Sequence, residues 1–344
     1  MNSLKVAIVL PVYNVASYLR ECLDSILAQE YKNFIVIAVN DGSTDGSREI
    51  LELYAKKDSR IIVLDQENSG ISSVRNRALE LIEAMKDIDY VSFIDSDDTV
   101  DVRFLSQHIS VLKSENADVS VCGYTQCEMG TRKKAKVFNH KKILSRKDFV
   151  NIIYRFSDWK RVHGDGGMVW KQVYRTSTIQ GLRFIDDKFF VEDELYNIQV
   201  AKIAQKFVYI PENLYFYRSV PTSLTNQDAF LIKLMNGRRK CYELCQEFPL
   251  EQQLTILSAF IEAVILVLKA GHHVVDIKKY EKECQIAYKA GMLRGKTYRR
   301  FLSYCHFPRL IMLIFKVKNF FRKIWDCMTN LISLRKCVSK GLCD

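Results

Sequence analysis

Three carboxylates within four residues follow an apolar run near residue 95. Asp95, Asp97 and Asp98 come directly after residues 90–94, which have the composition of a buried strand. Like charges this close together are costly to bury unless a cation neutralises them. Mg²⁺ or Mn²⁺ held by one or two carboxylates and by phosphate oxygens would neutralise them. The cluster therefore predicts a divalent-metal site, with a solvated turn at the start of the next helix as the alternative.

Two polar loops follow apolar runs in the same way and have the composition of anion-binding turns. In the first, residues 40–47, Asp41 is expected to accept hydrogen bonds from a base or a ribose. In the second, residues 66–77, Arg75 and Arg77 lie in the first turns of a helix. Arginines there oppose the helix dipole, so an anionic ligand such as a pyrophosphate would compensate for them. An ordinary capped turn and solvated arginines are the alternatives.

Residues 11–14, Pro-Val-Tyr-Asn, end the first apolar run of the chain. Tyr13 would place an aromatic ring where a nucleobase can pack, and Asn14 would place a polar amide beside it. The end of this run is therefore a third candidate for contact with a nucleotide.

These polar segments need an element that holds them, and the chain pattern predicts a mostly parallel sheet. Within the first 125 residues, short apolar runs alternate with helical periodicity, which is typical of strands covered by helices. The expected strands are residues 6–12, 34–39, 61–64, 90–94 and 119–124, and the expected helices include 19–27, 46–57 and 71–85. The last of these helices is expected to bury Val74, Ala78, Leu81 and Met85. The polar loops would then lie at the carboxyl edge of the sheet, where open α/β sheets bind ligands.

The alternation stops near residue 125. Residues 132–147 hold eight Lys and Arg and no acid, which predicts a solvated hairpin or loop. Residues 160–225 mix glycines with aromatics, and long helical patterns follow from residue 228. The predicted organisation is a domain of residues 1–227, with a nucleotide-binding half (1–125) and an acceptor and catalytic half (126–227), and a helical region of residues 228–344.

In order and spacing, four segments closely resemble the signature of glycosyltransferase family 2. They are Pro11-Val12-Tyr13-Asn14, Asn40-Asp41-Gly42-Ser43-Thr44-Asp45, Asn68-Ser69-Gly70 with Arg75-Asn76, and Asp95-Ser96-Asp97-Asp98. The resemblance covers residues 5–225. It implies an α/β fold of the GT-A type, in which a nucleotide-binding, mostly parallel sheet is flanked by helices. The helical C-terminal region follows this fold.

The resemblance implies a role for each matching residue. Tyr13 and Asp41 would contact the nucleobase, usually uracil. Asp95 would lie near the ribose, Asp97 would ligate the Mn²⁺ or Mg²⁺ that bridges the diphosphate, and Asp98 would support the acceptor or the donor sugar. The expected donor-binding residues are Pro11, Tyr13, Asn14, Asp41, Ser69, Arg75, Asp95 and Ser96. The expected metal ligands are Asp97 and Asp95.

Residues 190–196, Phe-Val-Glu-Asp-Glu-Leu-Tyr, resemble the family's Glu-Asp motif, in which the Asp is the general base. A hydroxyl is a poor nucleophile, so a carboxylate within hydrogen-bond reach must remove its proton during the attack. Asp193 is expected to be this base and Glu192 to orient it, while Glu194 is the rival. An exposed acidic face at a helix start is the alternative.

Two further segments are similar to parts of that family. Residues 166–175 resemble the segment that supplies an aromatic platform for sugar rings, which makes Trp170 a candidate acceptor contact and a core tryptophan the alternative. Lys171 departs from the Asn often found there. Residues 215–225 resemble the loop that closes over the diphosphate, where Arg218 would neutralise leaving-group charge. Strand packing also explains the tyrosines of this segment, and a lone His163 is more typical of a polar loop than of a metal ligand.

Together these expectations describe an inverting, metal-dependent glycosyltransferase. It would transfer a sugar from a UDP-sugar to a hydroxyl of a saccharide or lipid-linked saccharide, in the synthesis of a polysaccharide, capsule or lipopolysaccharide. A sugar nucleotidyltransferase is one alternative, but it would need a glycine-rich, basic phosphate loop that residues 11–14 do not provide. A catalytically inactive membrane-surface binding module of the same fold is the other alternative.

Charge is concentrated at the end of the chain. The 344 residues carry a net charge of +11, and residues 301–344 hold eight Lys and Arg against two Asp. Apolar residues recur at helical spacing between residues 310 and 332, which is typical of a basic amphipathic helix on an anionic membrane. A helix packed on the protein itself or on a partner chain is the alternative. Nucleic acid is not an expected partner, because the basic residues do not alternate with exposed aromatics elsewhere.

The remaining features of the sequence predict a cytoplasmic location. The chain start lacks the layout of a signal peptide, and the most apolar stretch, residues 256–268, is shorter than the roughly 20 residues of a membrane span. The ten cysteines form no CxxC pair or Cys/His cluster, which favours reduced thiols over zinc or disulfides. We therefore expect no transmembrane helix, and a peripheral protein at the inner face of the cytoplasmic membrane.

Overall fold

The computed structural model describes most of the chain, and the chain divides into two compact units. The described residues are 4–128, 131–135, 138–154, 167–185, 191–219, 229–270, 277–291, 293 and 295–306. Unit 1 is Met1–Gln253 and unit 2 is Leu254–Asp344. The domain boundary predicted at residues 227 and 228, and the predicted amphipathic segment after residue 306, lie outside the described residues.

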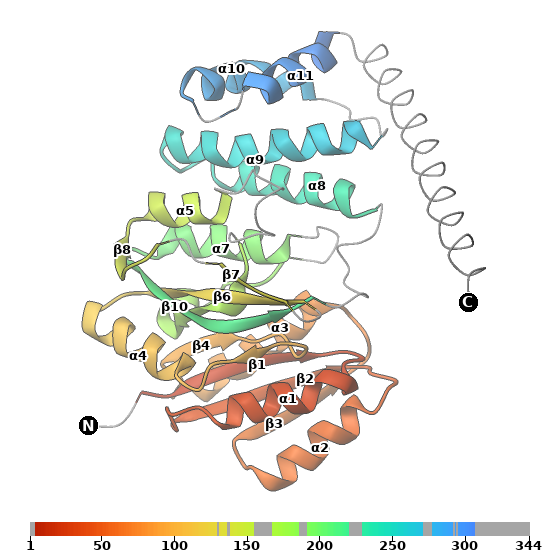
Figure 1. Cartoon of the computed structure of the whole chain (residues 1–344), viewed down its shortest axis with the longest axis vertical. Helices are drawn as coiled ribbons and strands as arrows, with labels where there is room; N and C mark the ends of the chain where they lie inside the picture. The colour runs from red at the N-terminus through yellow and green to blue at the C-terminus, as the bar shows by residue number, and fades with distance from the viewer. Residues whose placement is uncertain are drawn as a thin grey trace, which may run out of the picture. The chain divides into compact units, whose positions relative to one another are not determined.

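Unit 1 is built on a ten-stranded mixed sheet (Figure 1). The strands are β1 (Val6–Val12), β2 (Phe34–Asp41), β3 (Ile61–Gln66), β4 (Tyr90–Phe93), β5 (Thr99–Val100), β6 (Val119–Glu128), β7 (Thr131–Ala135), β8 (Lys142–Leu144), β9 (Gln172–Arg175) and β10 (Phe207–Arg218). Their order is β3-β2-β1-β4-β9-β6-β10-β5, with β7 beside β6 and β8 beside β10. The pairs among β3, β2, β1 and β4 are parallel, as predicted, whereas β9 runs antiparallel between β4 and β6.

Helices cover both sides of this sheet (Figure 1). They are α1 (Ala16–Leu27), α2 (Ser47–Lys57), α3 (Ile71–Met85), α4 (Phe104–Glu115), α5 (Arg146–Tyr154), the 3₁₀ turn η1 (Val169–Lys171), α6 (Thr176–Ile179), α7 (Glu192–Ile203) and α8 (Ala229–Leu244). Successive side chains of a strand point to opposite faces, so every second residue of β1 meets the same layer. Val6, Ile8 and Leu10 accordingly share one core cluster with Leu19 and Leu23 of α1. The predicted α/β fold is confirmed.

Helix α3 buries a different face from the one that its apolar residues predict. Val74 and Ala78 are buried as expected, but Leu81 and Met85 are only partly buried. The inward face instead includes Arg75, which is 1% exposed. A long side chain with a permanent charge is rarely buried unless it is paired, so this arginine must meet acidic partners inside the unit.

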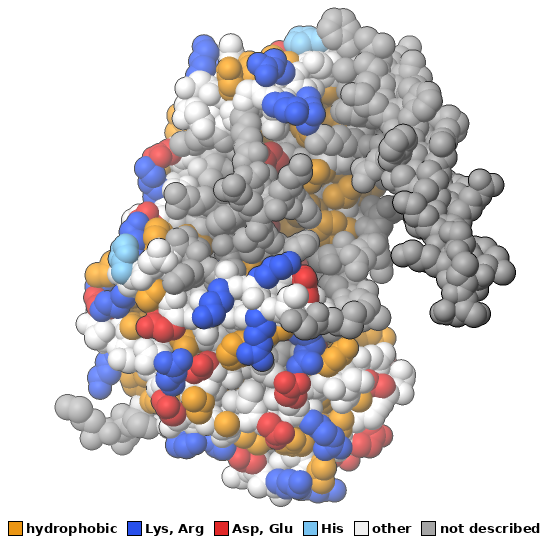
Figure 2. Space-filling view, viewed as in Figure 1, with side chains coloured by type: hydrophobic (Ala, Val, Ile, Leu, Met, Phe, Trp, Pro, Cys, Tyr) orange, Lys and Arg blue, Asp and Glu red, His pale blue; other side chains and the backbone are white. Residues whose placement is uncertain are grey.

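The basic segment, predicted to be a solvated hairpin or loop, instead contributes two strands to the sheet, and these strands pair with β6 and β10 rather than with each other. β7 pairs antiparallel with β6, and β8 pairs antiparallel with the start of β10. The side chains of Arg132, Lys133 and Lys134 are exposed. Elsewhere on unit 1, basic side chains are mixed with acidic ones, and Figure 2 shows both signs of charge side by side over its lower part, where α1 and α2 lie in Figure 1.

The helix α9 (Leu250–Lys269) begins in unit 1 and continues into unit 2, which also holds η3 (Ile277–Tyr280), α10 (Glu281–Lys289) and α11 (Gly295–His306). Within unit 2, the ring of Phe260 contacts the ring of Tyr280 with 5.1 Å between centroids. α9 is longer than the apolar stretch seen in the sequence, and residues Leu250–Leu268 are long and apolar enough to cross a membrane. Because 61% of that window is buried, a core helix explains it as well, and the expected absence of a membrane span stays a prediction.

Candidate active site

The loops that follow β1 and β2 hold each other in place. Asn14 adopts φ +51°, a left-handed conformation that Asn tolerates, and its side-chain oxygen accepts the Thr44 N–H at 2.8 Å. Asp45 accepts the N–H of Ala16, the first residue of α1, at 2.9 Å. These contacts fix the start of α1 and the end of β1, where Pro11 is partly buried and the Tyr13 side chain is 50% exposed.

The carboxylate of Asp41 is buried and bound by three protein donors. It accepts the backbone N–H groups of Ser69 at 2.9 Å and Gly70 at 3.0 Å, and the side-chain amide of Gln66 at 2.7 Å. This corrects the expectation of a carboxylate free for a ligand. A carboxylate that is 3% exposed needs hydrogen-bond donors from the protein. The N–H groups at the start of α3 provide them, because they have no acceptor within the helix. Asp41 therefore shapes the loop of Ser69, and its contact with a nucleobase stays a prediction.

The acidic cluster lies after β4, the neighbour of β1, so it shares the sheet edge with these loops. Asp98, at its end, is 1% exposed and has both oxygens occupied. One accepts the Tyr215 hydroxyl at 2.8 Å and the other accepts the Arg218 N–H at 2.7 Å. This corrects the predicted sugar contact of Asp98, because its carboxylate joins the cluster to the end of β10 instead. Ser96 is also buried, at 5% exposed.

Burial raises the pKa of each carboxyl group in the cluster. It raises the pKa of Asp95 to about 7, with Arg75 opposing the shift and the charges of Asp193 and Asp97 adding to it. Burial and the neighbouring carboxylates hold the pKa of Asp98 well above its ordinary value, and burial raises that of Asp97 as well. These shifts mean that the ionised cluster lacks sufficient compensating positive charge from the protein.

The donor set fits a divalent cation that is shared with a ligand. Among the described residues, no basic side chain is within ion-pair distance of the Asp97 carboxylate, whereas Asp95 already contacts Arg75 at 3.2 Å. No group of three or more His, Cys, Asp or Glu side chains in the described part of the chain could hold a metal by itself. Mg²⁺ and Mn²⁺ commonly take one or two carboxylates and complete their coordination with phosphate oxygens and water. Asp97 is therefore the better-placed ligand of the two that the sequence predicts.

Arg218 lies against the backbone of the acidic cluster. Its Nε donates to the Asp97 carbonyl oxygen at 2.9 Å, and its Nη2 donates to Glu21 of α1 at 2.6 Å. The guanidinium carbon lies 5.0 Å from the centre of the Tyr18 ring. These contacts place a positive charge at the cluster, as the predicted role in neutralising a leaving group requires, and that role stays a prediction.

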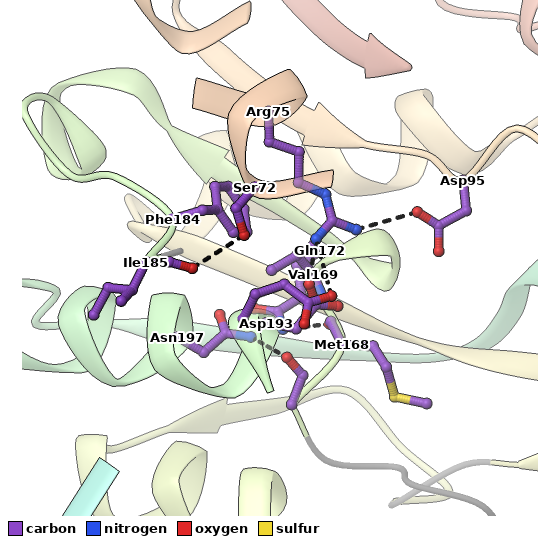
Figure 3. Close-up of polar contacts among 12 residues, drawn as sticks. Ser72, Arg75, Asp95, Met168, Val169, Gln172, Phe184, Ile185, Asp193 and Asn197 are labelled. Carbon is purple, nitrogen blue, oxygen red and sulfur yellow. Dashed lines mark hydrogen bonds and ion pairs between the residues drawn. The ribbon is translucent and has the colours of Figure 1, made fainter. Parts of the chain in front are cut away.

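Arg75 joins the acidic cluster to the predicted base (Figure 3). Its Nη1 lies 2.6 Å from Asp193 Oδ1 and its Nη2 lies 3.2 Å from Asp95 Oδ1. Glu192 adds a third carboxylate at 3.7 Å. The predicted compensation of this arginine by a pyrophosphate is wrong, because protein carboxylates surround the guanidinium. Two acids 98 positions apart in the sequence thus meet at one side chain.

The three acids at the start of α7 each have a specific partner, so they do not form an exposed helix face. Asp193 Oδ2 accepts the Val169 N–H at 3.0 Å, in addition to its contact with Arg75. Glu194 pairs with Arg238 of α8 at 3.3 Å. The side chains of Asp193 and Glu194 are 17% and 14% exposed. Of these two acids, only Asp193 pairs with Arg75, the arginine that also pairs with Asp95 of the acidic cluster. This favours Asp193 over Glu194 as the base.

Trp170 is a core residue, which corrects its predicted role as a sugar platform. It is 3% exposed, and its ring stacks on the rings of Tyr215 and Tyr217 at centroid distances of 4.3 and 5.6 Å. Tyr124 meets it edge-on at 5.1 Å. With these rings around it, the indole has no free face for a pyranose. The neighbouring Lys171 is also buried, at 1% exposed.

Some contacts of the site carry no signal in the sequence. Tyr215 and Val169 lie in segments that resemble the family, but no pattern indicates that the Tyr215 hydroxyl binds Asp98 or that the Val169 N–H binds Asp193. Arg238 lies in an unremarkable amphipathic helix. Their partners are distant in the chain, so no local pattern identifies them. His163 and the part of the predicted closing loop after Ser219 lie outside the described residues.

The fold and the site together define the class. An α/β sheet gathers polar loops and an acidic cluster at its carboxyl edge, and a second carboxylate from α7 reaches the same edge, as in a GT-A glycosyltransferase domain. Residues 7–177 match the model of "Glycosyl transferase family 2". The chain belongs to glycosyltransferase family 2.

Curated relatives of this chain are also named as glycosyltransferases. Over 75% of this chain, the sequence is 30% identical to glycosyltransferase GlyA of Streptococcus pneumoniae. Over 64% of this chain, it is 30% identical to the uncharacterized glycosyltransferase EpsJ of Bacillus subtilis. The matches cover 37% of GlyA and 62% of EpsJ, so the chain spans less than two thirds of these relatives.

A solved structure shares the fold over nearly the whole chain. TarS residues 1–349 of S. aureus, in complex with UDP-GlcNAc, superposes with a TM-score of 0.70 and covers 93% of this chain and 92% of its own. The sequence identity is 18%, so the likeness concerns the fold.

Proposed function

We propose that this chain is an inverting, metal-dependent glycosyltransferase that transfers a sugar from a UDP-sugar to a hydroxyl group. The observation that carries the proposal is the contact of Arg75 with both Asp95 and Asp193. A donor-side acidic cluster and a separate carboxylate that accepts a proton are the two parts that direct displacement requires, and one guanidinium holds them together. UDP-GlcNAc is the first donor to test, because TarS, which shares the fold, binds it.

Asp193 has the capacity to act as the base. A carboxylate offers about four lone-pair positions, and Arg75 and the Val169 N–H use two of them. A remaining position accepts the hydrogen of the acceptor hydroxyl. The acceptor oxygen then forms a bond with the anomeric carbon while the bond to the diphosphate oxygen breaks, which inverts the configuration. The proton passes to Asp193, and the bonding electrons leave with the nucleoside diphosphate.

The acidic cluster and Arg218 serve the departing diphosphate. Asp97 would hold the Mn²⁺ or Mg²⁺, which when bound neutralises phosphate charge and so eases departure of the diphosphate. Arg218, fixed on the Asp97 carbonyl oxygen, adds a second positive charge at the same place. Tyr13, exposed beside the loop of Asn14, is the surface on which the base of the donor would stack.

The acceptor is proposed to be a saccharide or lipid-linked saccharide in the synthesis of a surface polysaccharide. Support comes from relatives such as the putative teichuronic acid biosynthesis glycosyltransferase TuaG of Bacillus subtilis, which is 36% identical over 35% of this chain. The basic end of the sequence supports a peripheral position on the inner, anionic face of the cytoplasmic membrane.

A donor screen tests the proposal. The purified full chain is mixed with a panel of UDP-sugars and with Mn²⁺, Mg²⁺ or EDTA, and thermal protection and release of UDP are measured. We expect one UDP-sugar to protect the protein only with metal, and NMR of the product to show an inverted anomeric centre. Protection and transfer that persist in EDTA would contradict the metal role of Asp97.

Replacing the base separates binding from chemistry. Asp193→Asn keeps the shape of the side chain but removes its capacity to take a proton. We expect the donor to protect this variant as it protects the wild type, while UDP release falls roughly 10²–10⁴-fold. A variant that turns over normally would exclude Asp193 as the base.

A further inference from the structure

The geometry points to Arg238, on α8, as a positioning residue that holds the Asp193 base in place through Glu194. This inference rests on the proposed function. α8 lies beyond residues 7–177, the segment that the family model matches, so the family signature assigns this arginine no role. Arg238 does not contact the acidic cluster in any described interaction, and its effect on the reaction would be indirect.

The pair of Arg238 and Glu194 is a two-point contact in a sheltered position. Arg238 Nη2 lies 3.3 Å from Glu194 Oε1, and its Nε lies 3.4 Å from Glu194 Oε2. Both side chains are 14% exposed. A forked contact between a guanidinium and a carboxylate fixes orientation as well as distance, and water screens it little at this exposure. The contact therefore restrains the rotation of the first turn of α7.

Gly167 restrains the same turn by its close contact with Glu194. A Cβ atom at residue 167 would lie 2.4 Å from Glu194 Cγ and 3.1 Å from Glu194 Cα, which no side chain tolerates without a shift. The Gly167 carbonyl oxygen also accepts the side-chain amide of Asn197, one turn further along α7, at 2.6 Å. Two residues after Gly167, the Val169 N–H binds Asp193. The segment 167–169 is thus packed along the turn that carries the base.

These restraints explain how a helix outside the matched segment controls the reacting carboxylate. Asp193 precedes Glu194 directly, so any rotation of the turn moves its oxygens relative to Arg75 and Val169. A displacement of about 1 Å in a reacting group can cost on the order of 10²-fold in rate. The Arg238 pair keeps Asp193 at the distances from Arg75 and Val169 that the structure shows. Donor binding, which depends on the strand-end loops and the acidic cluster, does not depend on it.

The test uses the full chain and a matched control. The variants are Arg238→Gln, Glu194→Gln, the double variant, Arg238→Lys, and the control Arg239→Gln. Arg239 is the next residue of α8, its side chain is 41% exposed, and it pairs only weakly, at 4.0 Å, with Glu243 of its own helix. The measurements are steady-state release of UDP from UDP-GlcNAc with Mn²⁺, the Kd of UDP by calorimetry, and hydrogen exchange of the peptide that covers the start of α7.

We expect Arg238→Gln and Glu194→Gln to lower kcat at least tenfold while the Kd of UDP and the KM for UDP-GlcNAc stay within twofold. The double variant should be no slower than the slower single variant, because the two changes break the same contact between Arg238 and Glu194. Arg238→Lys should recover part of the rate, and Arg239→Gln should match the wild type. Hydrogen exchange at the start of α7 should quicken in Arg238→Gln and not in Arg239→Gln.

The outcomes separate this inference from the proposed function. Wild-type kcat in Arg238→Gln, or a loss of UDP affinity equal to the loss of rate, would overturn the positioning role and leave the proposed function standing. If the wild type releases no UDP from any UDP-sugar, the proposed function fails. The positioning role is then decided by hydrogen exchange, and equal exchange in Arg238→Gln and Arg239→Gln would exclude it.

Discussion

Arg75 Nη1 and Asp193 Oδ1 lie 2.6 Å apart, although 118 positions separate these residues in the chain. The same guanidinium reaches Asp95 with its other nitrogen at 3.2 Å. The side chain of Arg75 is 2% exposed, so this ion pair replaces solvent as the source of compensation for its charge. The contact defines one site from two distant acidic segments.

Removing the charge of Arg75 should destabilise the protein. Arg75→Gln leaves Asp95 and Asp193 without their shared cation in a sheltered position, and losing one partner of such a pair costs roughly 3 kcal/mol in the free energy of unfolding. Arg75→Lys should be less damaging to stability but should still lower turnover, because a single ammonium nitrogen does not reproduce the two separate contacts that Nη1 and Nη2 make with Asp193 and Asp95. Urea denaturation and UDP release measure the two effects. Unchanged stability in Arg75→Gln would mean that solvent compensates the carboxylates.

Asp97→Asn should weaken donor binding without weakening the fold. Its carboxylate makes no ion pair among the described residues, so the amide leaves no buried charge unpaired. Loss of a hard anionic ligand should lower the affinity for UDP in Mn²⁺ at least tenfold, and the Tm without ligand should stay within a few degrees of the wild type. Calorimetry with Mn²⁺ and with EDTA provides the comparison. In EDTA, the variant and the wild type should bind UDP equally weakly.

The stability of the metal-free protein should depend on pH through Asp95. Its pKa is raised from 3.8 to about 7 in the folded protein, so the folded state binds the proton more tightly than the unfolded state does. The stabilising contribution is therefore complete below pH 3.8 and is lost as the pH rises through about 7. Wild type in EDTA should lose stability relative to Asp95→Asn between pH 4 and pH 7. A difference that stays constant over this range would show that the raised pKa is absent.

Metal should reverse this dependence. A divalent cation binds the ionised carboxylates, so Mn²⁺ affinity should rise as the pH increases towards 8 and the cluster loses its protons. Titration of the protein with Mn²⁺ at several pH values, followed by the Tm, measures the effect. Equal Mn²⁺ affinity at pH 5.5 and pH 8 would show that the metal does not bind to the carboxylates of this cluster.

Two aromatic residues should behave in opposite ways. Tyr13→Ala removes a ring that is 50% exposed, so the free energy of unfolding should change by no more than about 0.5 kcal/mol while the affinity for UDP falls. Trp170→Ala empties a site between stacked tyrosines and should cost about 3–5 kcal/mol. Chemical denaturation and UDP calorimetry on both variants test the contrast. A stable Trp170→Ala variant would argue against the core role of this residue.

The sequence by itself determined that the first half of the chain consists of parallel strand-and-helix units, and it located the polar motifs at the strand ends. It did not determine the order of these strands in the sheet. Near-continuous apolar runs specify strands buried on both faces, and this local periodicity does not depend on distant contacts. The motif matches also identified the acids around residues 95 and 193 and the family to which the chain belongs.

The partners of those residues were decided by the tertiary structure. β9 enters the sheet antiparallel between β4 and β6, and the 3₁₀ turn η1 precedes it, so Val169 lies near the acidic cluster, where α7 meets it. This arrangement buries Arg75, which the sequence pattern assigns to an anionic ligand, and it places Trp170 in the core. It also occupies Asp41 and Asp98 with protein donors. Periodicity determines which face of an element is buried, but the pairing of two polar side chains depends on which elements become neighbours, and that is a property of the folded chain.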